Sequence, residues 1–271
     1  MDVDLHIHST ASDGTQAPTD VVRRAVAVGL DVVALTDHDT VAGVSEALEA
    51  VGSQSVQVVP GVELSSSWHG REIHVLGYFL DPEAPALKEH ARRAQEGRER
   101  RLREMVRRLA EGGTPVPFDD VLAAAGDARS SLGRPHLARA LVGCGHAESV
   151  PDAFDRLIGD EHPAFVPTEL LTPEEAVRVI RDSGGVAVWA HPPSDLLDGL
   201  LPDLRAAGLE GLEIYRPHVH QEKVRRLEAV ARSTGLIVSG GSDWHGPDDG
   251  ELGEFRVSSQ DVDALLHAGG L

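Results

Sequence analysis

The sequence predicts an α/β protein: a barrel of strands with a helical insertion. Short apolar runs alternate with helical patterns along most of the 271 residues, as in repeated βα units with a parallel sheet. Polar residues follow nearly every apolar run, which favours a barrel whose loops gather at one end over a doubly wound sheet. Residues 85–163 have helical patterns only, which predicts an insertion between the fourth and fifth strands.

Seven apolar runs have the length and composition of buried strands. They comprise residues 3–7, 32–35, 56–59, 73–79, 186–190, 212–215 and 237–239. Amphipathic helices are predicted over residues 19–28, 173–182 and 220–233. Gly29 and Gly235 are expected to end two of them, because glycine readily adopts the left-handed conformation found at helix C-termini. The barrel domain is therefore predicted to comprise residues 1–84 and 164–271.

The insertion, residues 85–163, is predicted to contain four helices and to act as a lid over the barrel. Its helices are expected over residues 87–111, 118–125, 135–142 and 152–158. Residues 86–111 contain nine Lys or Arg and five Asp or Glu, a formal charge of +4. Arg93, Arg100 and Arg107 lie seven apart on one exposed stripe. This stripe either guides the phosphates of an RNA substrate or forms a solvated surface of Glu–Arg pairs.

Composition excludes several classes of protein. A formal charge of −19 argues against binding along duplex DNA, although bound cations would still admit a phosphorylated substrate. Cys144 is the one cysteine, so no internal disulfide is expected, and we predict that it is a packing residue. The sequence shows neither a signal-peptide pattern nor an apolar run long enough for a membrane helix. We therefore expect a cytoplasmic protein without a membrane partner, and its oligomeric state stays open.

The first strand carries a pair of histidines two residues apart. Residues i and i+2 of a strand project to the same face, so His6 and His8 can bind one metal ion together. Such a pair is also found among packed or surface histidines. Asp13 follows in a predicted turn and is a third candidate ligand.

Polar residues also follow the second and third strands. His38, within the segment TDHD, is the expected ligand after the second strand. Asp37 is predicted to orient an imidazole, and Asp39 to cap the helix that begins near Val41. Glu63 follows the third strand among apolar neighbours, where a carboxylate requires a metal ion or another cation.

Later strands complete a set of nine candidate metal ligands. They are His6, His8, Asp13, His38, Glu63, His74, His191, Asp243 and His245. Six histidines and three carboxylates exceed the needs of one ion, so we expect three divalent ions, with Glu63 bridging two. Nitrogen and oxygen ligands without thiolate favour Mn, Fe or Zn. Ions roughly 3.5–4 Å apart would clamp a phosphoryl group and ionise a bridging water, which gives Glu63 and Asp243 catalytic roles.

A phosphate group also needs partners other than metal ions. Arg134 and His136 in the insertion, and Arg216 and His218 after the sixth strand, are candidate substrate-binding residues. Arg134 and His218 are also candidate catalytic residues. The alternatives are a surface arginine and a helix-capping histidine. Glu213 on the sixth strand is expected to support a ligand.

Together these motifs resemble the PHP (polymerase and histidinol phosphatase) superfamily. The matching segments, in family order, are DLHIHSTASDGT, ALTDHDT, PGVELS, EIHVLGYF, AHP and GSDWHG. The segment GRPHLARALV is similar to the branch of nucleoside 3′,5′-bisphosphate phosphatases and 5′→3′ exoribonucleases acting on short RNA. The resemblance implies a distorted, TIM-like (β/α)7 barrel with a trinuclear metal site.

Residue by residue, the resemblance also implies how the ligands are divided. One ion is held by His6, His8, Glu63 and Asp243, a second by Glu63, His74 and His191, and a third by Asp13, His38 and His245. The expected substrate is a phosphorylated small molecule or short oligonucleotide. A histidinol-phosphate phosphatase and a non-catalytic metal-binding module are the alternatives. An amidohydrolase is disfavoured, because a bridging carbamylated lysine would have to come from Lys88 or Lys223, both in helical patterns.

Overall fold

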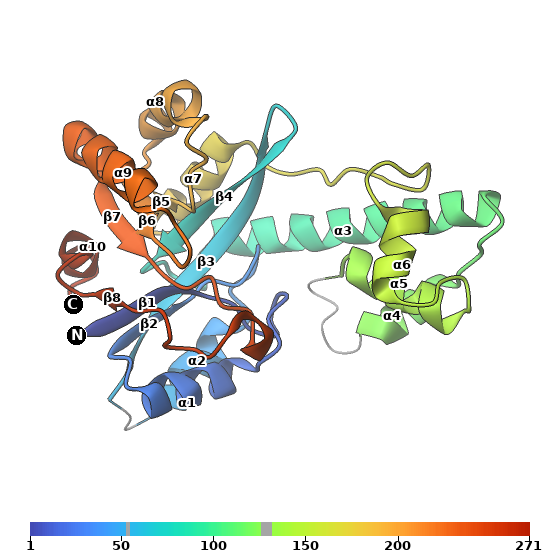
Figure 1. Cartoon of the computed structure of the whole chain (residues 1–271), viewed down its shortest axis with the longest axis horizontal. Coiled ribbons are helices and arrows are strands. Elements are labelled where there is room, and N and C mark those ends of the chain that lie inside the picture. Colours follow the sequence, from blue (N-terminus) through green and yellow to red (C-terminus); the bar gives the residue numbers. More distant parts are fainter. Residues whose placement is uncertain (53–54, 126–131) are drawn as a thin grey trace. The chain divides into compact units, whose positions relative to one another are not determined.

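The computed structural model describes residues 1–52, 55–125 and 132–271 (Figure 1). The chain forms two compact units, one of Met1–Ala91 with Leu170–Leu271 and one of Arg92–Glu169. The described residues contain no helix that is both long enough and apolar enough to cross a membrane.

The first unit is built on one sheet with the strand order β7-β6-β5-β4-β3-β2-β1-β8. Its strands are β1 (Asp2–Ile7), β2 (Val32–Leu35), β3 (Gln57–Trp68), β4 (Arg71–Tyr78), β5 (Val186–Trp189), β6 (Gly211–Tyr215), β7 (Ile237–Gly240) and β8 (Val257–Ser258). Strands β1 to β3 are parallel to one another, and so are β5 to β7. The prediction of a parallel sheet is wrong at β4, which is antiparallel to both of its neighbours.

The hairpin between β3 and β4 explains this difference. Trp68 pairs with Arg71, which leaves His69 and Gly70 as a two-residue turn with φ angles of 49° and 81°. Positive φ at both positions is the geometry of a type I′ turn, which suits the twist of a hairpin. Strand β3 therefore continues well past its predicted end at residue 59, and Glu63 lies inside the strand rather than after it.

The sheet curves into a nearly closed barrel. The segment after β7 reaches β1, where Trp244 pairs with Ile7 and accepts a hydrogen bond of 2.9 Å from the backbone N–H of His8. The backbone N–H of Asp243 donates to the carbonyl of His6 at 2.8 Å. Strand β8 pairs antiparallel with the other side of β1. The predicted distorted barrel is thus confirmed, and its closure brings the segment of Asp243 against β1.

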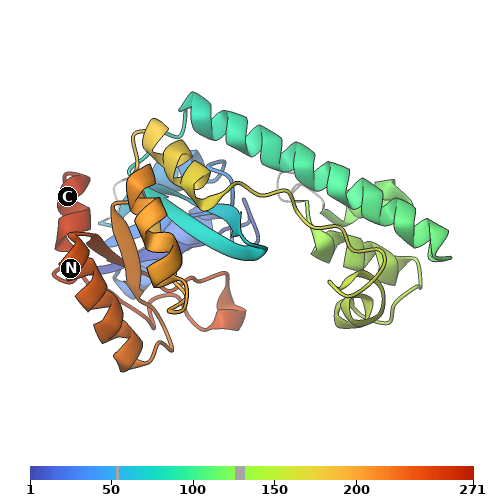
Figure 2. The ribbon, with the colours of Figure 1, turned by 90° about the horizontal axis from the view of Figure 1, so that it is seen from above.

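Helices cover the outside of the barrel. They are α1 (Pro18–Val28), α2 (Val44–Val51), α7 (Pro173–Asp182), α8 (Leu197–Ala207), α9 (Gln221–Thr234) and α10 (Asp263–Ala268). Helix α7 packs on β3, β4 and β5, and α9 packs on β6 and β7, as the yellow and orange ribbons of Figure 2 show. Gly29 and Gly235 end α1 and α9 with φ angles of 77° and 71°, as predicted. Helices α8 and α10 were not predicted.

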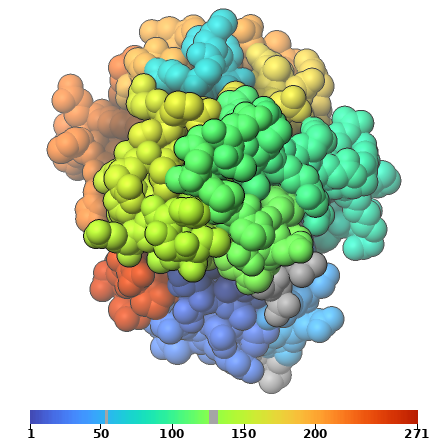
Figure 3. All heavy atoms as spheres, turned by 90° about the vertical axis from the view of Figure 1, so that its right-hand side faces the viewer, coloured from blue at the N-terminus to red at the C-terminus, as the bar shows by residue number. Residues whose placement is uncertain are grey.

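The described elements between β4 and α7 are helical. They are α3 (Pro85–Glu111), α4 (Phe118–Ala125), α5 (Arg134–Gly143), α6 (Val150–Ala153) and a π-helical turn (Phe154–Ile158). Helix α3 begins in the first unit and continues into the second. The second unit has its own core, in which Leu102 and Met105 of α3 belong to one cluster with Leu137 and Leu141 of α5. Figure 3 shows the surface of this unit in green and yellow-green. Cys144 is exposed, so the prediction that it is a packing residue is wrong.

Candidate metal centre

Glu63 lies at the centre of a group of histidines inside the first unit. The side chain is 1% exposed and comes from the middle of β3. Its Oε2 lies 3.1 Å from His6 Nε2, 3.2 Å from His8 Nε2 and 3.3 Å from His38 Nδ1. Its Oε1 lies 3.1 Å from His74 Nδ1 and 3.0 Å from His191 Nε2. The two oxygens of one carboxylate therefore face two different sets of imidazoles.

The first cluster consists of His6, His8, Glu63 and Asp243. The Nε2 atoms of His6 and His8 are 3.1 Å apart, and Asp243 Oδ1 lies 3.3 Å from each. Ligands placed about 2.0–2.2 Å from an ion in tetrahedral or octahedral geometry are roughly 3–3.5 Å from one another. The spacing of these four atoms therefore suits one transition-metal ion.

The second cluster shares Glu63 with the first. His74 Nδ1, His191 Nε2 and Glu63 Oε1 are 3.0–3.2 Å apart, a spacing similar to that of the first cluster. His38 also lies near Glu63 and His74 as a group that could hold an ion.

The third cluster is looser and lies nearer the surface. It consists of Asp13 and His38 with His245 and His8. Asp13 Oδ1 lies 3.5 Å from His245 Nε2, and Asp13 Oδ2 lies 3.8 Å from His38 Nε2. The side chain of Asp13 is 56% exposed, whereas His8 is fully buried. The loop that carries Asp13 would have to approach by a few tenths of an ångström to complete a coordination shell.

The chemistry of these donors fits divalent cations. In two places ring nitrogens face each other at hydrogen-bond distance, His6 against His8 and His74 against His191. Among the described residues, the buried Nδ1 atoms of His8 and His38 have no hydrogen-bond partner. Nitrogen lone pairs that converge with carboxylate oxygens need positive charge between them, and an ion supplies it better than shared protons.

Hydrogen bonds behind the clusters fix the ring orientations. His6 Nδ1 lies 2.7 Å from Oε1 of the buried Glu213 on β6, and His74 Nε2 lies 3.1 Å from Glu72 Oε1. His245 Nδ1 donates to the backbone carbonyl of Asp243 at 2.9 Å. In each ring the opposite nitrogen faces a cluster. Such outer contacts set the tautomer of a ligating imidazole and raise its basicity.

The buried histidines and carboxylates of the site shift one another's pKa values. Burial disfavours a protonated His6, yet the carboxylates of Glu63, Glu213 and Asp243 raise its pKa well above the ordinary value. Burial likewise disfavours a charged Glu63, and the facing histidines nevertheless hold its pKa well below the ordinary range. Burial raises the pKa of Asp4, beneath the first cluster, to about 6. The carboxylate of Glu63 therefore stays ionised, and it needs positive charge around it.

Two ligand candidates have an unusual backbone. His191 and Asp243 have φ angles of 70° and 59°, in the left-handed region that residues other than glycine rarely adopt. Such a conformation costs of order 1–3 kcal/mol and persists only where the surroundings enforce it. Both residues follow strand ends, where the chain must turn a side chain back toward the clusters.

Two predicted supporting roles are wrong. Among the described residues, Asp37 contacts no imidazole: it accepts hydrogen bonds of 2.7 Å from the backbone N–H and hydroxyl of Ser9 and from the hydroxyl of Ser12. It therefore holds the loop that leads to Asp13. Asp39 does not cap a helix, because α2 begins at Val44.

Asp39 instead ties three segments together. Its carboxylate accepts from the backbone N–H of Ser65 on β3 at 2.9 Å and lies 3.0 Å from Nε2 of His90 on α3. Its own backbone N–H donates to the carbonyl of Glu63 at 2.8 Å. Sequence reasoning missed His90, because nothing in its helical surroundings marks a residue whose partner is 51 positions away.

The four candidate phosphate-binding residues have different surroundings. In the second unit, Arg134 pairs with Asp160 and lies over the rings of Phe165 and Phe154, at 5.2 and 5.5 Å. His136 Nδ1 accepts from the backbone N–H of Gly133 at 3.0 Å, as a helix-capping contact.

In the first unit, the other two candidates follow β6. His218 is exposed, with a φ of 60°. Arg216 donates to Asp243 Oδ2 at 2.6 Å. Arg216 is therefore the candidate that directly contacts a member of the first cluster.

The described contacts of the Arg-rich helix fit a surface of ion pairs. Arg107 pairs with Glu104 and Glu111, and Arg100 pairs with Glu169 at 3.3 Å. Exposed pairs of this kind contribute little to stability. They do occupy the guanidinium groups that an RNA phosphate would need.

The fold and the buried clusters define a metal-dependent hydrolase with an α/β barrel, and comparisons with known proteins identify its class. The PHP domain family model matches residues 4–116. A 5′-3′ exoribonuclease of Haemophilus influenzae is 36% identical over 249 residues, covering 90% of each chain. A 3′,5′-nucleoside bisphosphate phosphatase of Chromobacterium violaceum is 34% identical over 253 residues, covering 92% of this chain and 88% of that one.

Two further matches broaden the comparison. A phosphoribosyl 1,2-cyclic phosphate 1,2-diphosphodiesterase of Eggerthella lenta is 36% identical over 251 residues, covering 90% of this chain and 94% of that one. A crystal structure from Bifidobacterium adolescentis superimposes with a TM-score of 0.82 at 33% identity. The protein in that structure is described as a metal-dependent phosphoesterase. It covers 98% of this chain and 96% of that one. The chain belongs to the PHP family and is a metal-dependent phosphoric ester hydrolase.

Proposed function

We propose that this enzyme hydrolyses phosphate esters of nucleotides, namely nucleoside 3′,5′-bisphosphates, 5′-phosphorylated short RNA, or both. The observation that carries the metal-dependent part is the carboxylate of Glu63, whose two oxygens face separate sets of imidazoles at 3.0–3.3 Å. The substrate class is supported by the relatives named as an exoribonuclease and as a nucleoside bisphosphate phosphatase.

Three divalent ions, Mn, Fe or Zn, are proposed to bind at the three clusters. Their ligands would be His6, His8, Glu63 and Asp243 for the first, Glu63, His74 and His191 for the second, and Asp13, His38 and His245 for the third. Bound ions would neutralise the phosphoryl oxygens and make a water molecule acidic enough to attack phosphorus at neutral pH.

The chain's own residues prepare this chemistry. Glu63 holds both inner clusters at a fixed separation, because one rigid carboxylate on a central strand belongs to both. Glu213 keeps the Nε2 of His6 directed at the first cluster through its contact with Nδ1. His218, which follows β6 in the first unit, is our candidate for a contact with a substrate phosphate, since its ring N–H can donate to a phosphate oxygen.

Two other kinds of phosphate ester are alternatives to nucleotides as the substrate. The relative from Eggerthella lenta makes a ribose cyclic phosphate a specific alternative, at an identity equal to that of the exoribonuclease. Histidinol phosphate is the other, from the wider family. Both are phosphate esters, so the metal clusters alone do not discriminate among them.

A substrate panel with Mn²⁺ tests the proposal. Phosphate release is measured from adenosine 3′,5′-bisphosphate, AMP and histidinol phosphate. Hydrolysis of phosphoribosyl 1,2-cyclic phosphate, whose ring opening alone frees no phosphate, is followed by chromatography of its products, and hydrolysis of a short 5′-phosphorylated RNA by gel analysis. We expect the highest kcat/KM for the bisphosphate or the RNA. A higher kcat/KM for the cyclic phosphate or for histidinol phosphate would contradict the proposed substrate class.

A further inference from the structure

Arg216 joins two carboxylates that lie on different sides of the first cluster. It follows β6, and its Nη2 donates to Asp243 Oδ2 at 2.6 Å. Its Nε lies 3.5 Å from Oε2 of Glu213, which lies three residues earlier on β6. The other oxygen of each carboxylate faces His6: Glu213 Oε1 lies 2.7 Å from His6 Nδ1, and Asp243 Oδ1 lies 3.3 Å from His6 Nε2.

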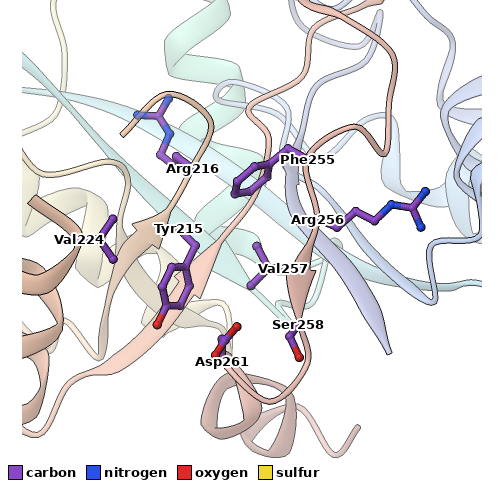
Figure 4. Close-up of a pocket in the computed structure, with 8 residues that line it drawn as sticks. All are labelled: Tyr215, Arg216, Val224, Phe255, Arg256, Val257, Ser258 and Asp261. Carbon is purple, nitrogen blue, oxygen red and sulfur yellow. The ribbon is translucent and has the colours of Figure 1, made fainter. Parts of the chain in front are cut away.

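The guanidinium is directed toward this cluster rather than toward the neighbouring cavity. The stem of Arg216 lines a cavity of about 170 Å³ with Tyr215 and Phe255. Figure 4 shows the guanidinium pointing away from the rings of both residues. The side chain is 27% exposed, while its Nε is buried and, among the described residues, has no hydrogen-bond partner. Oε2 of Glu213 is also buried without a hydrogen bond, so a small approach would satisfy both atoms.

These contacts fix how Asp243 faces the cluster. A carboxylate at the end of a strand can turn to present one oxygen or both to a cation. Arg216 holds Oδ2, so only Oδ1 is presented to the point shared by His6 and His8. The same guanidinium lies behind Glu213, which orients His6. One side chain therefore constrains two of the four members of the cluster.

We propose that Arg216 is a positioning residue for the ion of the first cluster, and that it is not a phosphate-binding residue. The inference rests on the proposed function in one respect, namely that an ion binds at this cluster. The edge of the guanidinium formed by Nε and Nη2 faces Glu213 and Asp243, so a bidentate phosphate contact along that edge would require Arg216 to release Asp243 Oδ2. Releasing it would leave Asp243 free to rotate away from the ion.

Two effects of opposite sign act on metal affinity. The positive charge of Arg216 repels a cation, so its removal alone would tighten binding. Loss of the fixed orientation of Asp243 and Glu213 would weaken binding, and the mutation of such supporting residues typically lowers metal affinity 10–100-fold. Because the guanidinium is bound directly to the back of Asp243, we expect the loss of orientation to dominate.

The test compares Arg216→Gln and Arg216→Lys with the matched control Arg256→Gln. Arg256 lines the same cavity, but it contacts Asp2 and the carbonyls of Val28 and Gly253 rather than any cluster residue. Metal-free protein is titrated with MnCl2 by calorimetry, thermal unfolding confirms that each variant is folded, and kcat and KM for adenosine 3′,5′-bisphosphate are measured at saturating Mn²⁺.

For Arg216→Gln we expect one Mn²⁺ ion to bind 10–100-fold more weakly, with KM for the bisphosphate unchanged once Mn²⁺ is saturating. Arg216→Lys keeps the charge but cannot make the bidentate contacts of a guanidinium. Its Mn²⁺ affinity should therefore lie between those of the wild type and Arg216→Gln. Arg256→Gln should bind Mn²⁺ like the wild type.

Other outcomes overturn the inference. Unchanged or tighter Mn²⁺ binding in a folded Arg216→Gln protein would show that orientation is not what Arg216 provides. A raised KM at unchanged Mn²⁺ affinity would make Arg216 a phosphate-binding residue. Both leave the proposed function intact, whereas a wild-type protein that binds none of Mn²⁺, Fe²⁺ and Zn²⁺ would overturn the proposed function and this inference together.

Discussion

Replacing Glu63 with glutamine removes one negative charge at nearly constant shape. In the wild type, Oε1 and Oε2 together face five imidazole nitrogens at 3.0–3.3 Å, and the side chain is 1% exposed. Glutamine keeps one oxygen, which is neutral, so at most one inner cluster retains an oxygen ligand in a similar position. The amide NH2 would face imidazoles in the other cluster, and an amide nitrogen does not ligate a metal ion of this kind.

We expect Glu63→Gln to lower kcat at least about 100-fold, which corresponds to about 2.7 kcal/mol of lost transition-state stabilisation. The protein should also lose at least one bound ion per chain. Glu63→Ala, which removes both oxygens, should lower activity at least as much. The assay is phosphate release at saturating Mn²⁺, with ion content from elemental analysis of the same preparations.

Glu72→Gln is the matched control for this prediction. Glu72 is the same residue type on the adjacent strand β4, and it contacts the outer nitrogen of His74 at 3.1 Å, with its side chain 62% exposed. At saturating Mn²⁺ its loss should lower kcat much less, because the ligating atoms stay in place and excess Mn²⁺ offsets any weaker metal affinity. If folded Glu63→Gln protein, verified by circular dichroism and thermal unfolding, keeps normal turnover and ion content, the reasoning about a shared carboxylate is refuted.

Three further predictions concern metal content and the surrounding residues. Protein loaded with Mn²⁺ should carry two to three ions per chain by elemental analysis, and a maximum of one ion would exclude the trinuclear arrangement. Asp37→Asn should weaken the binding of one ion only, since the loop that leads to Asp13 loses an acceptor for its hydrogen bonds. Calorimetry showing that all ions bind with unchanged affinity would refute this. Replacing Arg93, Arg100 and Arg107 with Gln should change KM by small and equal factors for a 5′-phosphorylated oligonucleotide and for a single-nucleotide bisphosphate. A raised KM and a flatter salt dependence for the oligonucleotide alone would instead support guidance of RNA along α3.

The sequence was most informative where a local pattern determines geometry. Two histidines two residues apart on a buried strand must share a face, and the Nε2 atoms of His6 and His8 do lie 3.1 Å apart. Glycines after amphipathic helices end them in the left-handed conformation, as predicted for Gly29 and Gly235. Both features depend on neighbouring residues alone.

The extent of β3 was not predicted because proline and glycine normally interrupt strands. Here Pro60 pairs with Leu35 across the sheet, and a Cβ on Gly61 would lie 2.7 Å from the carbonyl oxygen of Leu35. Glycine is thus required by the close approach of β2, rather than by a turn. The His69-Gly70 turn was the available signal for the hairpin, but Asn-Gly and Asp-Gly are the commoner sequences for such turns.

Supporting contacts between distant segments were beyond local reasoning. Asp37 and Asp39 are adjacent to the candidate ligand His38, yet their partners follow β1 or lie on β3, which pairing within the sheet brings near. Arg216 likewise meets Asp243 across 27 positions. Acidic and basic side chains have many possible partners, so the choice is made by tertiary packing and not by spacing along the chain.

Anomalous diffraction tests most directly whether Glu63 lies between bound metal ions. Crystals of the protein loaded with Mn²⁺ would be measured above and below the Mn absorption edge. We predict three anomalous peaks, two of them within about 2.0–2.2 Å of different oxygens of Glu63 and the third near Asp13, His38 and His245. A single peak, or peaks away from Glu63, would contradict this prediction.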